Sequence, residues 1–116
     1  METEDDIKES RQVFSSLLQL IADFKSQVDY QREVPIANVP AELVCMWFDD
    51  HYHPEREWFK ESFAEEERKL MADFNEYYEK RVDHLPHTHD VLELQISTVW
   101  QEIAEKAKDV WAKIKW

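Results

Sequence analysis

Apolar residues recur every seven positions through the first quarter of the chain. The series is Ile7, Phe14, Ile21 and Val28, with Leu17 and Phe24 between them. This spacing places the side chains on one side of an α-helix and is typical of coiled-coil packing. Val13, Leu18 and Leu20 widen the stripe, so we expect more than one neighbour to pack on it. The pattern predicts a helix from about Glu4 to Asp29.

Two prolines shape the next stretch. Pro35 and Pro40 disfavour helix in the residues before them, which predicts an extended linker from Tyr30 to Pro40. Pro40 also suits the first turn of a helix, and we expect a short helix from there to about Asp50. Trp47 lies in the densest apolar run of this segment. We predict that Trp47 is a buried anchor of the core.

The second half of the chain predicts two more long helices. A helical turn is expected around Trp58, and Ser62 and Glu65 then have the spacing of a capping box. We therefore expect a long helix from Ser62 to about Leu85, where a proline follows. The last helix is expected to begin near Thr88 or Asp90 and to run to the end of the chain. The predicted fold class is all-α: a single helical domain over residues 1–116, with three long amphipathic helices and one or two short ones.

Composition narrows the function classes. The chain of 116 residues has no glycine, which excludes the glycine-rich motifs that bind nucleotides. It carries 26 acidic residues against 14 lysines and arginines, a formal net charge of −12. That charge repels nucleic acid and anionic membranes, so we expect neither as a partner, and it favours a basic protein partner. The acidic N-terminus, the absence of a long apolar run and the single cysteine lead us to expect a cytoplasmic protein.

The five histidines fall into two clusters that could bind metal. One cluster contains His51 and His53, and the other contains His84, His87 and His89. Imidazole and carboxylate groups are ligands for zinc, nickel and iron, so the second cluster is the candidate metal site. However, the chain has no His-Glu-x-x-His helix, and the helix expected between the clusters holds them far apart. We therefore expect surface histidines, no tightly held metal and no cofactor.

Nucleophilic catalysis has weaker support. Cys45 lies between Val44 and Met46, a setting typical of a buried, unreactive thiol. A reactive thiolate needs an electropositive surrounding, whereas the charged residues near Cys45 are acidic. No catalytic residue is predicted.

An acidic pair beside aromatic residues is the predicted partner-binding site. It consists of Asp49, Asp50, Tyr52 and Trp58. Acidic groups speed encounter with a basic partner, and tyrosine and tryptophan are favoured anchors of protein interfaces. The leading hypothesis is a small, acidic, non-enzymatic binding protein that masks a basic protein, comparable in size and charge to immunity proteins and antitoxins. The alternatives are a metal-dependent enzyme that uses the histidine clusters and a structural module that forms homo-oligomers through the heptads of the first helix.

Overall fold

The computed structural model describes residues 3–116, and every regular element in that range is helical. In chain order the elements are α1 (Glu4–Ala22), α2 (Phe24–Glu33), α3 (Val39–Cys45), the π-helix η1 (Met46–His51), α4 (Glu57–Ser62), α5 (Glu65–Glu79), the 3₁₀-helix η2 (Val82–His84), α6 (Val91–Gln95) and α7 (Thr98–Lys113). The all-α prediction is confirmed. None of these helices has an apolar stretch long enough to cross a bilayer.

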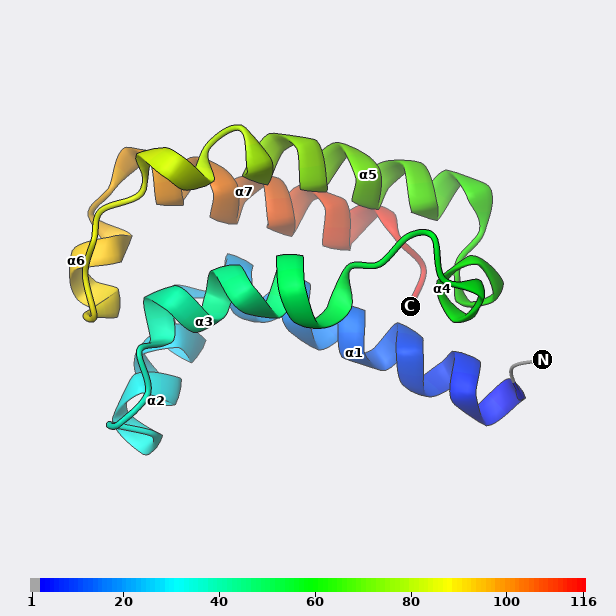
Figure 1. Ribbon diagram of the computed structural model, residues 1–116, viewed down its shortest axis with the longest axis horizontal. Helices are drawn as coiled ribbons and strands as arrows, with labels where there is room; N and C mark the ends of the chain where they lie inside the picture. Colours follow the sequence, from blue (N-terminus) through cyan, green and yellow to red (C-terminus); the bar gives the residue numbers. More distant parts are fainter. Residues whose placement is uncertain (1–2) are drawn as a thin grey trace.

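The helices form two layers (Figure 1). α5 and α7 run side by side in one layer, and α1 lies with α3 and η1 in the other. The helix α1 packs along α7, where the indole N–H of Trp111 donates a 3.0 Å hydrogen bond to the hydroxyl of Ser15. The short helices α2 and α6 close one end of the molecule, and α4 lies at the other.

The prediction of three long helices is wrong, and the first break falls at Asp23. This residue has an extended backbone (φ −108°, ψ 106°), so the helix expected from Glu4 to Asp29 is divided into α1 and α2. Its carboxylate accepts hydrogen bonds from the amide of Lys25 at 3.2 Å and the hydroxyl of Ser26 at 2.7 Å. Aspartate side chains offer the backbone this alternative to a continuous helix. The new helix α2 continues to Glu33, so the predicted extended linker shrinks to residues 34–38.

The last predicted helix is broken in the same way. Asp90 accepts a hydrogen bond from the amide of Leu92 and caps α6, and Ser97 accepts one from the amide of Trp100 and caps α7. The helix α5 begins at Glu65 with Ala64 as its N-cap, later than the predicted start at Ser62, and it ends at Glu79, before the predicted Leu85. These caps turn two predicted helices into shorter segments that can wrap around one core.

One continuous hydrophobic core joins both layers. Its largest fully buried side chains are Trp47, Trp100, Tyr78, Phe14, Phe59 and Phe74. Trp47 has no exposed surface, which confirms the prediction that it is buried. Its ring lies edge-on to Phe74 at 4.8 Å between centroids, and its indole N–H donates a 3.0 Å hydrogen bond to Asn75.

A buried glutamine connects the break after α1 to the opposite layer. Gln27 is fully buried in α2, and its amide nitrogen donates 2.9 Å hydrogen bonds to the carbonyls of Leu20 and Ile21. Carbonyls in the last turn of a helix lack intrahelical partners, so these bonds satisfy the end of α1. The amide oxygen of Gln27 accepts from the indole N–H of Trp100 at 3.2 Å and from the side chain of Gln95 at 3.1 Å. One side chain therefore holds α1, α2, α6 and α7 together.

An arginine in α1 fastens the C-terminal residues to the bundle. Arg11 pairs with both carboxylate oxygens of Glu67, at 2.9 and 3.0 Å, and also donates to the carbonyls of Ser62 and Lys115. Its guanidinium lies 5.2 Å from the ring of Phe63. Because Arg11 donates to this carboxylate, the pKa of Glu67 is held below its ordinary value, with help from the backbone amide of residue 64.

Candidate functional site

The candidate site is built on a π-helical turn. The helix α3 passes directly into η1, and the amide of Tyr52 donates a 2.9 Å hydrogen bond to the carbonyl of Trp47, five residues earlier. π-turns are rare and occur frequently at functional sites. In this turn Trp47 is buried, whereas Asp49 and Asp50 are exposed. The acidic pair is therefore exposed on the same turn in which Trp47 is buried, and the burial of Trp47 holds the backbone of this turn in place.

The chain segment that contains this turn carries acidic side chains but no lysine or arginine. Residues 33–55 contain five acidic residues and no lysine or arginine. Cys45 belongs to this segment: it is exposed, so the prediction of a buried thiol is wrong. Partial desolvation raises the pKa of the Cys45 thiol, and a hydrogen bond with Asp49 and the nearby carboxylates raise it further. The thiol is therefore kept protonated and poorly nucleophilic.

The two aromatic residues of the predicted site are half-buried. Tyr52 is stacked on Trp47, with 4.7 Å between ring centroids and 11° between ring planes. Burial raises the pKa of the Tyr52 hydroxyl, and the charge of Glu55 adds to the effect. Trp58 lies 6.2 Å from the ring of Phe14. The structure thus exposes the acidic pair, stacks Tyr52 on the buried Trp47, and packs Trp58 against Phe14 and Phe59.

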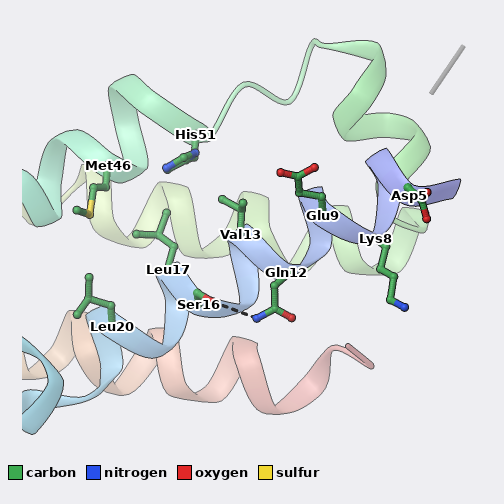
Figure 2. Close-up of a pocket in the computed structure, with 10 residues that line it drawn as sticks. All are labelled: Asp5, Lys8, Glu9, Gln12, Val13, Ser16, Leu17, Leu20, Met46 and His51. Carbon is green, nitrogen blue, oxygen red and sulfur yellow. Dashed lines mark hydrogen bonds between the residues drawn. The ribbon is translucent and has the colours of Figure 1, made fainter. Parts of the chain in front are cut away.

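An open apolar groove lies beside the π-turn, and sequence reasoning did not find it. It has a volume of about 660 Å³ and runs between one side of α1 and η1. It is lined by Asp5, Lys8, Glu9, Gln12, Val13, Ser16, Leu17, Leu20, Met46 and His51. Figure 2 shows the side chains of Val13, Leu17, Met46 and His51 pointing into the space between the two elements. The widened apolar stripe of the first helix was the available signal, because Val13 and Leu20 lie beside the core positions.

The histidine clusters do not form a metal site in this arrangement. The ring of His53 contacts the backbone carbonyl of Asp49 at 2.9 Å, and His51 lies at the groove, 6.4 Å from the ring of Phe14. His84, His87 and His89 are exposed around the segment that joins η2 to α6. Within residues 3–116, no three histidine, cysteine or acidic side chains are placed so that they could hold a metal ion.

The heptad residues of the first helix pack within the chain. Phe14 and Ile21 are buried in the core, and Leu17 is only 5 % exposed. These side chains are the ones that a coiled-coil seam would present to another subunit. They serve the intramolecular core instead.

No protein family matches this chain, and no curated protein or solved structure is significantly similar to it.

Proposed function

We propose that the protein is a non-enzymatic binding module that engages a basic protein partner through the surface of α3 and η1. The observation that carries the proposal is the acidic run of residues 33–55, which includes the exposed pair Asp49 and Asp50. A surface of one sign attracts an oppositely charged partner and raises the rate of encounter.

The rigidity of the turn supports the same proposal. Trp47, directly below the acidic pair, is fully buried, stacked on Tyr52 and hydrogen-bonded to Asn75. A binding surface that is already ordered loses little conformational entropy when a partner binds. Inhibitory proteins that mask an enzyme need such a preformed surface.

The test is the association rate with a partner isolated on the immobilised protein from cell extract. Association should slow as salt rises, because charges more than ~8 Å apart are screened at physiological ionic strength. Replacing both Asp49 and Asp50 with asparagine should lower the association rate several-fold and leave the thermal midpoint unchanged.

A matched control removes the same charge elsewhere. Glu65 and Glu66 are an adjacent, exposed acidic pair at the start of α5. Replacing both with glutamine should change the association rate less than the Asp49/Asp50 replacement does. A partner that binds equally fast at low and high salt, and is indifferent to Asp49 and Asp50, would contradict the proposal.

A further inference from the structure

We propose that the groove between α1 and η1 binds an amphipathic, basic α-helix of the partner. This inference rests on the proposed function and specifies the shape of the partner's binding segment. Four features of the groove carry it: its apolar floor, its length, its charge and the form of its walls.

The floor of the groove is apolar surface with no covering segment among residues 3–116. Val13 is 36 % exposed on α1, and Leu20 and Met46 are partly exposed beside it. The sulfur-containing side chain of Met46 is flexible and polarizable, which suits it to packing against varied apolar groups. A partner that buries this floor gains hydrophobic stabilisation that a purely charged contact would lack.

The length of the groove matches a helix of about four turns. The α1 residues that line it begin at Asp5, end at Leu20 and alternate in steps of three and one. This is one complete side of α1 over ~22 Å at 1.5 Å rise per residue. A helix laid along such a side contacts it through residues at i, i+3, i+4 and i+7, the pattern of helix-in-groove recognition.

The charges of the groove specify a basic occupant and its placement. Asp5 and Glu9 line the end near the start of α1, against one basic residue, Lys8. The apolar residues Leu17 and Leu20 lie at the opposite end. The occupant should therefore place its basic residues near Asp5 and Glu9 and its apolar anchor at the other end.

The walls of the groove favour a helix over an extended peptide. An extended segment needs a partner for its backbone N–H and C=O groups, which an exposed sheet edge can provide. Both walls are helices, and no strand exists among residues 3–116. A helical occupant satisfies its own backbone and needs only side-chain contacts.

The probe for this inference is a synthetic peptide of leucine, lysine and alanine, about 18 residues long, with leucines at i, i+3, i+4 and i+7. A second peptide has the same composition in an order that destroys the apolar stripe, and a third replaces every lysine with glutamate. Binding to the intact protein is measured by fluorescence anisotropy, and peptide helicity by circular dichroism. The first peptide should bind and gain helicity, the scrambled one should bind at least tenfold more weakly, and the acidic one should not bind.

The deciding variant is Val13→Glu, because it should raise the affinity of binding that depends on charge alone and lower the affinity of binding to the apolar floor. It adds negative charge beside Glu9, which strengthens binding that depends on charge alone, but it obstructs the apolar floor. We expect at least tenfold weaker binding of the stripe-bearing peptide. Ile96 is 80 % exposed between α6 and α7 and does not line this groove, so Ile96→Glu adds the same charge elsewhere and should leave binding within about twofold. If Val13→Glu lowers the thermal midpoint, Val13→Ser is tested instead. It removes apolar surface from the floor without adding charge, and it should also weaken binding of the stripe-bearing peptide.

The outcomes separate this inference from the proposed function. If both basic peptides bind equally well and binding depends on Asp49 and Asp50 but not on Val13, the helical occupant is wrong and the acidic binding surface stands. If neither basic peptide binds at low salt, both proposals are overturned.

Discussion

The buried amide of Gln27 should be the most consequential polar side chain for the stability of this fold. In Gln27→Leu the volume is nearly kept, but the carbonyls of Leu20 and Ile21 and the indole N–H of Trp100 lose their partner. The bonds to Ile21 and Trp100 are fully buried, whereas the bond to Leu20 is only partly buried. Water can therefore replace the lost partner of Leu20 more easily than the other two.

The expected cost follows from those two fully buried groups. A buried donor or acceptor left unsatisfied costs ~1–3 kcal/mol. Two such groups destabilise the protein by ~2–6 kcal/mol, and burial of the extra apolar surface of leucine offsets ~1–2 kcal/mol of this loss. These ranges give a net loss of ~0–5 kcal/mol in the free energy of unfolding, centred at about 2.5 kcal/mol, against the ~5–15 kcal/mol that stabilises a typical domain.

The assay is urea unfolding followed by tryptophan fluorescence and far-ultraviolet circular dichroism, which should report one coincident transition. Gln19→Leu is the matched control, because Gln19 is exposed on α1, and it should change stability by no more than about 0.5 kcal/mol. A Gln27→Leu protein that is at least as stable as the wild type would refute the reasoning. This result would mean that the end of α1 and the indole of Trp100 find other partners.

Two further predictions concern Trp47 in the core and the Arg11–Glu67 ion pair. Trp47→Ala should lower the free energy of unfolding by ~3–5 kcal/mol, since the side chain is fully buried, and an unchanged thermal midpoint would show that the ring is not a core anchor. The Arg11–Glu67 pair should stabilise the protein at neutral pH and lose that effect in acid. Because folding lowers the pKa of Glu67, its contribution is present above the ordinary carboxyl pKa of 4.5 and disappears as pH falls through the lower folded value. The stability difference between the wild type and Glu67→Gln should therefore shrink below pH 4.5, and a constant difference across that range would contradict the assignment.

The helical class could be predicted from the sequence because it depends on long-range repetition. The apolar periodicity and the absence of glycine both point to helices, and the core positions Phe14, Ile21 and Trp47 follow from them. The breaks could not be predicted, because Asp23 and Ser97 are tolerated inside helices as well as at their ends. Their side chains act as caps only because the flanking segments pack in different directions, which is a tertiary effect.

The candidate site was predictable in its charge but not in its shape. Exposure of Asp49 and Asp50 follows from the chemistry of aspartate, whereas the π-turn that presents them has no recognisable sequence pattern. The groove depends on which apolar residues of α1 remain uncovered after packing. Val13 and Phe14 are adjacent and similarly apolar, yet one lines the groove and the other is buried. The rings of Trp47, Phe59 and Phe63 pack on Phe14, whereas Val13 faces the groove between α1 and η1.

Mapping the bound peptide on the protein tests the central claim most directly. Backbone amide resonances of isotope-labelled protein are followed while the basic, stripe-bearing peptide is added. The account predicts that the shifts concentrate along α1 from Asp5 to Leu20 and in η1 from Met46 to His51, with the turn around Ile36 unaffected. Shifts spread evenly over the exposed acidic residues, or concentrated away from α1 and η1, would contradict it.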